Sequence, residues 1–335
     1  MKIFLRTFLI LNGTYKRKRK RFLFLSKNKN ETAFLHSNIK DSSKTLLYKD
    51  FVNSKQLERR SMKKINKDGL TEEEFLKSYN PGDYPKPSVT VDIMVLRMKE
   101  DLSCMQILLI QRSNHPYMDQ WALPGGFIDM NESAYEAACR ELQEETGLTD
   151  VYMEQLYTMS KPNRDPRMRI IDISYIALLP YEKRDEVTAG DDAKNAVWFD
   201  ISLKDDEMVL SNKEEYVKIR YTLTQELFKN GRVAVKNPVP HQTGNEALAF
   251  DHSEIILEGL MRLKNKVMYT DVAFNLVPEE FTLPDLQNVY EVILGKELYA
   301  KNFRDKVEQK VVNLQRKYKP LSSSRISTLY KYKEI

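Results

Sequence analysis

The chain has 335 residues, of which 41% are hydrophobic and 10% aromatic, so it can form hydrophobic cores, and its length favours two domains. Two cysteines exclude a disulfide framework, and the lack of an apolar run of 18 residues argues against a membrane helix, so we expect a cytoplasmic protein. The net charge of +5 conceals an asymmetry: Lys and Arg outnumber Asp and Glu by 16 to 4 in residues 1–61 and by 11 to 4 in residues 296–335, but are outnumbered 40 to 26 in residues 62–295.

Residues 1–61 form a basic leader. Its apolar start precedes the basic block Lys16–Arg21, the reverse of the order in a secretory signal peptide. One interpretation is a basic arm that binds nucleic acid. The other is that translation begins at Met62, because Glu58–Arg60 can be encoded by a purine-rich stretch that resembles a bacterial ribosome-binding site. On either interpretation we expect the leader to be poorly ordered.

Residues 62–205 show the pattern of an α/β domain. Apolar residues alternate in strand fashion, and a helical segment interrupts the strands after a glycine-rich loop. The expected strands are Val89–Met98, Gln106–Gln111, Tyr152–Met159, Ile170–Leu179 and Ala196–Phe199.

The helical segment follows the loop Leu123–Gly126. We expect a helix from Asn131, as its N-cap, to Thr146, because Gly147 is a typical C-terminal stop. Within it, glutamates spaced three and four residues apart share one face, and an arginine lies one turn from two carboxylates. Such glutamates usually form a solvated surface, but the glycines and the arginine beside them favour a metal site.

This segment fits every defined position of the Nudix box, G-x5-E-x7-R-E-U-x-E-E-x-G-U, where U is aliphatic. The chain therefore resembles the Nudix hydrolases, which implies an α/β/α sandwich with a mixed sheet. The positions that carry the resemblance are Gly126, Glu132, Arg140, Glu141, Glu144, Glu145 and Gly147.

The resemblance also implies a Mg²⁺ or Mn²⁺ site. In the family, the position of Gly126 offers a carbonyl, and those of Glu141, Glu144 and Glu145 offer carboxylates; with Arg140 they form the expected catalytic set. Such a metal neutralises a pyrophosphate and polarises the attacking water. The general base stays open between a box glutamate and a later carboxylate: Glu182, Asp185, Glu186, Asp191 or Asp192.

Shorter motifs resemble the ADP-ribose pyrophosphatase type of Nudix protein, notably WALPGGF before the box and NRDPR at residues 163–167. Guanidinium groups bind phosphates bidentately, and an indole ring can stack on a base. The alternatives are surface arginines and a core tryptophan. The predicted substrate-binding residues are Arg112, Trp121, Arg164 and Arg167.

Residues 206–252 are predicted to be a connecting helix and a linker. Apolar residues recur near the helical period between Lys213 and Lys229, and Asn230–Gly231 stops the pattern.

Residues 253–335 are predicted to form a second, mainly helical domain. After a helix at 253–267, Thr282 caps a helix that Gly295 ends, a basic helix follows from Ala300, and residues 311–314 and 327–332 can form a two-stranded wing. The stretch FTLPDLQNVYEVILGKELYAKNFRDKV resembles the winged-helix domain of Nudix-related regulators of NAD metabolism. A packing or dimerisation domain is the alternative. The predicted DNA contacts are Lys301, Asn302, Arg304 and Lys306.

Two functions follow. The first is a Mg²⁺-dependent hydrolase that cuts ADP-ribose or a related nucleoside diphosphate derivative. The alternative is a transcriptional regulator of NAD metabolism that senses ADP-ribose, binds double-stranded DNA and hydrolyses little or nothing. The intact box favours the first, because sensors can lose their carboxylates. We expect a homodimer, as is common for such Nudix domains, and no membrane partner.

Overall fold

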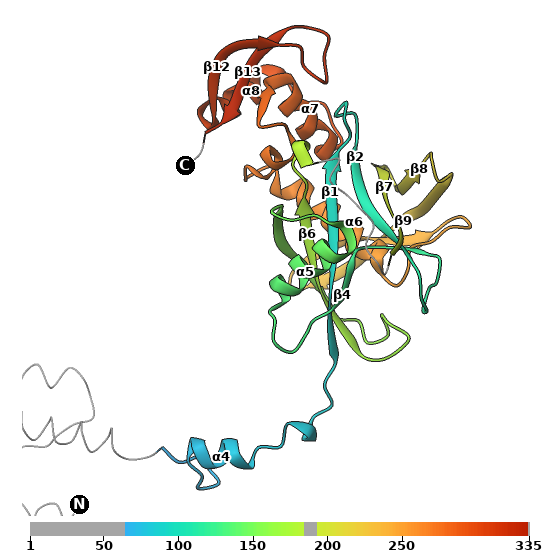
Figure 1. Ribbon diagram of the computed structural model, residues 1–335, viewed down its shortest axis with the longest axis vertical. Helices are drawn as coiled ribbons and strands as arrows, with labels where there is room; N and C mark the ends of the chain where they lie inside the picture. Colours follow the sequence, from blue (N-terminus) through green and yellow to red (C-terminus); the bar gives the residue numbers. More distant parts are fainter. Residues whose placement is uncertain (1–63, 184–192, 334–335) are drawn as a thin grey trace, which may run out of the picture. The chain divides into compact units, whose positions relative to one another are not determined.

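The computed structural model describes residues 64–183 and 193–333 (Figure 1). The predictions for the leader 1–61, and those for Asp185, Glu186, Asp191 and Asp192, lie outside these ranges. The chain divides into two compact units, 1–84 and 85–335. In the first unit, α4 (Glu72–Ser78) begins with a capping box between Thr71 and Glu74, and the short 3₁₀ turn η1 (Pro81–Asp83) follows.

The second unit contains a ten-stranded mixed sheet, which confirms the predicted sheet type. β1 pairs parallel with β6, and the other neighbours pair antiparallel. The main order is β10-β9-β8-β7-β2-β1-β6-β5, with β3 on β2 and β4 on β1. The strands are β1 (Ser88–Met98), β2 (Met105–Arg112), β3 (Trp121–Ala122), β4 (Gly125–Phe127), β5 (Tyr152–Met159), β6 (Ile170–Leu178), β7 (Ala193–Lys204), β8 (Glu207–Asn212), β9 (Val217–Asn230) and β10 (Val233–Gln242).

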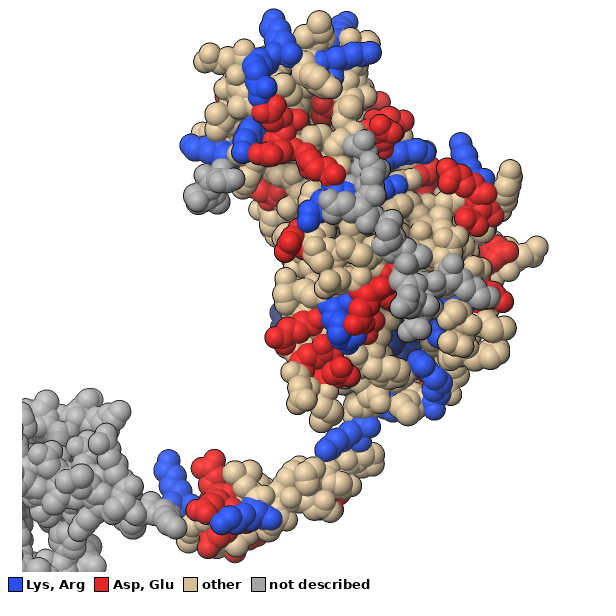
Figure 2. Space-filling view, in the orientation of Figure 1, with Lys and Arg blue, Asp and Glu red and all other residues tan. Residues whose placement is uncertain are grey.

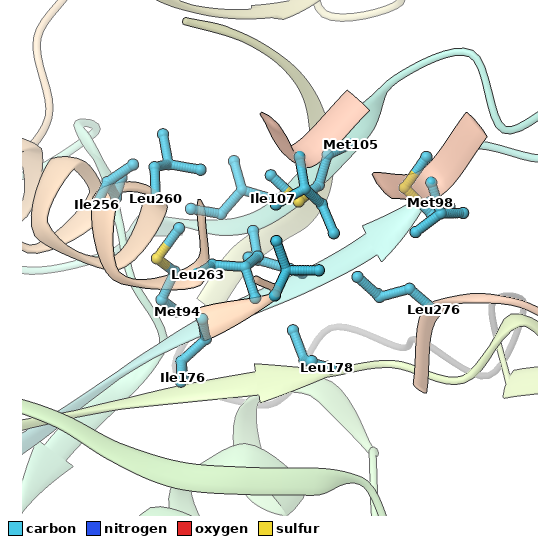
Figure 3. Close-up of a cluster of buried hydrophobic side chains, with 14 of the residues drawn as sticks. Met94, Met98, Met105, Ile107, Ile176, Leu178, Ile256, Leu260, Leu263 and Leu276 are labelled. Carbon is cyan, nitrogen blue, oxygen red and sulfur yellow. The ribbon is translucent and has the colours of Figure 1, made fainter. Parts of the chain in front are cut away.

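Helices cover both faces of this sheet, as expected for a Nudix sandwich. Successive side chains of β1 point to opposite faces. Val91 and Ile93 pack in one cluster with α5 (Ala134–Thr146), and Met94 packs in the other with α6 (His252–Lys266). Figure 3 shows Met94 lying against the side chains that α6 contributes. The sequence placed α6 in the second domain, yet it covers the sheet of the first.

The predicted helix at 213–229 is wrong, because this segment forms β9 and pairs with β8 and β10. Its buried residues Ile219, Tyr221 and Leu223 alternate with exposed ones, which is strand periodicity. Gly231 and Arg232 form the two-residue turn of the β9–β10 hairpin, with Gly231 in the left-handed region at φ 61°. Glycine at the first position of a two-residue turn is typical of a hairpin.

The winged-helix elements agree with the sequence. Thr282 caps α7 (Leu283–Leu294), and Gly295 ends it in the left-handed conformation at φ 65°. α8 (Ala300–Val307) follows, and β12 (Val311–Tyr318) and β13 (Ser327–Tyr332) form the wing, joined by the short β11 (Glu280–Thr282). Buried residues of α6, α7 and α8 belong to one hydrophobic cluster with β1 and β2, so this part packs directly on the sheet.

Candidate active site

The box helix α5 begins two residues later than predicted. Ser133, and not Asn131, is the N-cap: its hydroxyl accepts from the amide of Glu136, and the Glu136 carboxylate accepts from the amide of Ser133. This reciprocal capping box satisfies two backbone donors that a helix start otherwise leaves unpaired. Gly147 ends the helix at φ 73°, as predicted.

Arg140 holds three carboxylates of the box. Its guanidinium donates to Glu132 (2.7 Å), Glu141 (2.8 Å) and Glu144 (3.0 Å), and also to the carbonyl of Phe127 (3.1 Å). Glu136, which lies one turn before Arg140, is instead engaged in the helix cap. The hydrogen bonds with Glu132 and Glu141 raise the pKa of Arg140, so it stays charged. Arg140 therefore fixes the face that carries the predicted metal ligands.

The glycine loop lies against the same glutamates. The amide of Gly125 donates to Glu145 Oε2 at 2.7 Å. A Cβ atom at Gly126 would stand 2.2 Å from Glu141 Oε1, closer than real contacts allow, so any larger residue here would have to displace this carboxylate. Gly126, Glu141 and Glu145 are thus brought together, while the side chain of Glu144 is 58% exposed at the edge of the group.

These groups have the chemistry of a Mg²⁺ or Mn²⁺ site, because both ions favour carboxylate and carbonyl oxygens. Burial raises the pKa of Glu141, although the hydrogen bond from Arg140 opposes the shift. In the part of the chain that the structure describes, no group of three or more His, Cys, Asp or Glu side chains already converges on one point. Arg140 Nη1 contacts both Glu141 and Glu144. A bound cation would share these carboxylates with Arg140.

A buried polar cluster lies beneath the glycine loop. Arg164 contacts Asp251 at 2.7 Å and Asp92 at 3.4 Å, and its side chain is only 4% exposed. His252 Nδ1 accepts from the amide of Leu123 at 2.8 Å, and its Nε2 lies 3.6 Å from Asp92 Oδ2. Burial alone would lower the pKa of Arg164, but its hydrogen bond with Asp251 and the charge of Asp92 raise it overall.

Asp172 belongs to the same cluster and is fully buried. Thr90 and Ser174 donate to its carboxylate. Burial, together with the nearby charge of Asp92, raises the pKa of Asp172 well above its usual range. Asp92, Asp172, Asp251 and His252 were not among the predicted site residues. For Asp92 and Asp172 the available signal was a polar residue inside a buried strand pattern, which is informative because buried charges need partners.

Of the four predicted substrate contacts, Arg112 and Arg167 are accessible at the surface, whereas the side chains of Trp121 and Arg164 are buried. Arg164 is committed to Asp92 and Asp251. Trp121 is 4% exposed and packs edge-on against Phe199, with ring centroids 4.9 Å apart, so the core alternative is correct. Arg167 pairs with Asp165 at 2.7 Å but remains 40% exposed. Arg112 donates to the carbonyl of Pro116 and lies over the ring of Phe250.

The buried His252 predicts a pH effect on stability. Burial lowers the pKa of His252, although Asp92 and Asp251 oppose the shift. Below the unfolded pKa of about 6.5, the unfolded chain binds a proton that the folded chain does not, so stability falls as the pH drops. We expect His252→Asn, which can still accept from Leu123, to lose less stability than wild type between pH 7.5 and 5.5, by up to about 1.4 kcal/mol. Urea unfolding at both values measures this; identical losses would contradict it.

The predicted DNA contacts lie on α8. Lys301, Asn302 and Arg304 are exposed, whereas the inward Phe303 and Val307 are buried. Lys306 is turned back onto the protein, where it donates to the carbonyl of Met268. Figure 2 shows Lys and Arg side chains gathered at the end of the C-terminal part, where β12 and β13 lie in Figure 1. Within the described ranges, no helix is both long and apolar enough to cross a membrane.

Both parts of the second unit match known domain families. Residues 86–217 match the Nudix domain, and residues 273–332 match the NrtR DNA-binding winged helix domain. The ADPR responsive transcriptional repressor NtrR of Acinetobacter baylyi is 31% identical over 264 residues, which cover 78% of this chain and 88% of that protein. The chain belongs to the NrtR family of Nudix proteins.

Two further proteins are similar to this NrtR-family chain. The crystal structure of Shewanella oneidensis NrtR complexed with a 27mer DNA is 30% identical, with a TM-score of 0.53, and the match covers 73% of this chain and 93% of that one. The ADP-ribose pyrophosphatase of Methanocaldococcus jannaschii is 40% identical over 119 residues, which cover 36% of this chain and 65% of that protein. The first match extends over both domains, and the second is limited to about a third of the chain.

Proposed function

We propose that this NrtR-family protein is a DNA-binding regulator whose Nudix domain binds ADP-ribose or a related nucleoside diphosphate derivative. The observation that carries the proposal is the direct packing of the winged-helix part on the sheet that holds the box: Asn288 of α7 donates to the carbonyl of Leu102 beside β2, and the hydrophobic cluster is continuous. The repressor relative and the DNA-bound relative support it. A homodimer in the cytoplasm, reading two half-sites, fits this role.

α8 supplies the test of DNA binding. Lys301→Ala combined with Arg304→Ala removes two exposed charges, which we assign to phosphate contacts. We expect weaker binding to duplex DNA from the region upstream of the protein's own gene, and a slope of log K against log salt that is smaller by about 1.8. Fluorescence anisotropy between 50 and 200 mM salt, roughly the range in which such contacts are titrated, measures both.

Lys218→Ala combined with Lys229→Ala is the matched control, because it removes two exposed charges from β9. Equal losses of DNA affinity in the two double variants would mean that net charge, and not the position of the charges on α8, determines binding. No binding by wild type even at low salt would overturn the proposed role on DNA.

We further propose that the box retains pyrophosphohydrolase activity. Glu141, Glu144 and Glu145 are all present, and Arg140 and the glycine loop hold them in place. When bound, Mg²⁺ or Mn²⁺ neutralises the pyrophosphate oxygens and polarises the attacking water. Gly126, Glu141, Glu144 and Glu145 would hold it. Glu141, desolvated beside Gly126, is our candidate general base among the described carboxylates. Glu182 is less suited, because its carboxylate accepts from the amide of Glu279 at 2.6 Å.

A further inference from the structure

Two guanidinium groups lie close to one aromatic ring next to the glycine loop. Arg112 Cζ is 4.9 Å and Arg167 Cζ is 5.7 Å from the ring centroid of Phe250, and Tyr117 meets the same ring edge-on at 4.7 Å. Arg167 also lies over Phe127, the residue after Gly126. Phe250 is partly exposed and has φ 50°. A bulky residue in this region is uncommon and is often held there at a functional site.

The two guanidinium groups leave positive charge available to a ligand. Arg167 has Asp165 as a partner, but among residues 64–183 and 193–333 no carboxylate lies within ion-pair distance of Arg112. Burial and the charge of Arg167 lower the pKa of Arg112, although the charges of Asp92, Glu145 and Asp165 oppose the shift. Because Arg112 has no ion-pair partner among the described residues and lies near Arg167, the two guanidinium groups form a site to which an anion can bind with charge-assisted hydrogen bonds.

A buried acceptor without a partner lies on the same face. The amide of Arg112, at the end of β2, donates to the carbonyl of Gln120, just before β3, so the two residues are cross-strand neighbours. Ile110 and Ala122, two positions along on each strand, pack against Phe250, so Arg112 and Gln120 share that face. Gln120 Oε1 is buried and has no hydrogen-bond partner. Such an atom calls for a donor.

We propose that Arg112, Gln120, Arg167 and Phe250 form a base-recognition face that reads the adenine of a nucleoside diphosphate ligand. The base packs against Phe250 and Tyr117, its exocyclic amino group donates to Gln120 Oε1, and the diphosphate lies against the two guanidinium groups, toward the box. Aromatic stacking tolerates any base, whereas the buried acceptor selects one that carries a donor at that position. This inference rests on the proposed binding of an ADP-ribose-like ligand and adds the residues that choose its base.

The test compares ADP-ribose with its inosine analogue, in which a carbonyl oxygen replaces the amino group. Calorimetric titrations without divalent metal, so that neither compound is cleaved, should give wild type an ADP-ribose preference of about 10-fold or more. Gln120→Leu should abolish the preference by weakening ADP-ribose binding. Its ligand-free Tm should stay equal to wild type or rise, because an unsatisfied buried acceptor has been removed. A purely structural glutamine would give the opposite change in Tm.

Gln111→Leu is the matched control. Gln111 lies on the opposite face of the same strand and donates to the carbonyl of Asp119, so its loss should leave the preference intact. Phe250→Leu should weaken both ligands about equally, roughly 5-fold or more, because it removes stacking alone.

The outcomes separate this inference from the function on which it rests. If wild type binds neither nucleotide, the proposed ligand class itself fails. If wild type binds both with equal affinity, or if Gln120→Leu keeps the preference, the ligand class stands and the base-recognition face is wrong. A weakened binding of ribose 5-phosphate to Gln120→Leu would place a sugar, and not the base, against this acceptor and would also overturn the inference.

Discussion

Glu145→Gln is expected to lower Mg²⁺-dependent hydrolysis of ADP-ribose by about 100-fold or more, because it removes one charge from the group that we propose as the cation site. The glutamine oxygen can still accept from the amide of Gly125, so the loop should keep its position. The loss should therefore come from metal affinity and not from misfolding. Release of AMP measures activity, and Mn²⁺ titration followed by electron paramagnetic resonance measures metal binding independently.

Glu136→Gln is the matched control for this variant. It lies on the same helix, and glutamine can replace glutamate in a capping box, so α5 should form normally. We expect near wild-type hydrolysis and Mn²⁺ affinity. Equal activity of wild type and Glu145→Gln in the presence of Mg²⁺ would contradict the proposed role of the box glutamates in hydrolysis. If wild type binds ADP-ribose but releases no AMP, the proposed hydrolase activity is wrong and only the regulatory function remains.

Arg164→Met is expected to lower the free energy of unfolding by about 3–5 kcal/mol. The substitution leaves Asp92 and Asp251, whose side chains are 12% and 10% exposed, without their cation. Tm should fall by roughly 6–20 °C for a domain of this size. Urea unfolding measures the free energy, and thermal melting measures the Tm.

Arg169→Met provides the comparison for Arg164. Among the described residues, the exposed Arg169 donates to the carbonyls of Ser160 and Lys161, so its loss should cost at most about 1 kcal/mol. A change below about 1 kcal/mol in Arg164→Met would contradict the structural role assigned to the buried cluster. Arg164 would then be free to bind a ligand phosphate, as the sequence alone predicted.

Local sequence rules correctly predicted the elements for which the capping residues and the residue spacing indicate the same structure. Thr282 at a helix start and Gly295 at its end are found where capping chemistry places them, and the box spacing put three glutamates on one face of α5. The predicted helix at 213–229 was wrong because the apolar residues of this segment satisfy both the helical and the strand period. The segment is a strand because the chain reverses at Gly231–Arg232 and pairs with β10.

The buried cluster could not be predicted, because its members come together only through the fold. Asp92 lies on β1, Arg164 lies in the loop before β6, and His252 begins α6, more than 80 residues further along the chain. Spacing along a strand or helix carries no information about such contacts. The role of Arg164 could not be predicted for the same reason. An arginine suggested phosphate binding, but in the fold its buried side chain pairs with Asp92 and Asp251.

α6 connects the candidate active site with the winged helix. Its first residue, His252, accepts from the amide of Leu123 in the glycine loop, and the preceding Asp251 binds Arg164. Just beyond its other end, the carbonyl of Met268 accepts from Lys306 of α8. A ligand that moves the glycine loop therefore acts on an element that also contacts the predicted DNA-binding helix. Thermodynamic coupling between two such sites typically amounts to about 5–150-fold in affinity.

The central claim, that one chain couples a Nudix ligand site to DNA binding, is tested most directly by measuring DNA affinity while ADP-ribose is titrated. The measurement uses the full chain, its own upstream duplex and no divalent metal, so that the ligand persists. We predict that saturating ADP-ribose changes the Kd for DNA by at least about 5-fold, with a reciprocal change in ADP-ribose affinity when DNA is bound. A DNA affinity that stays constant while calorimetry shows ADP-ribose bound would contradict the account.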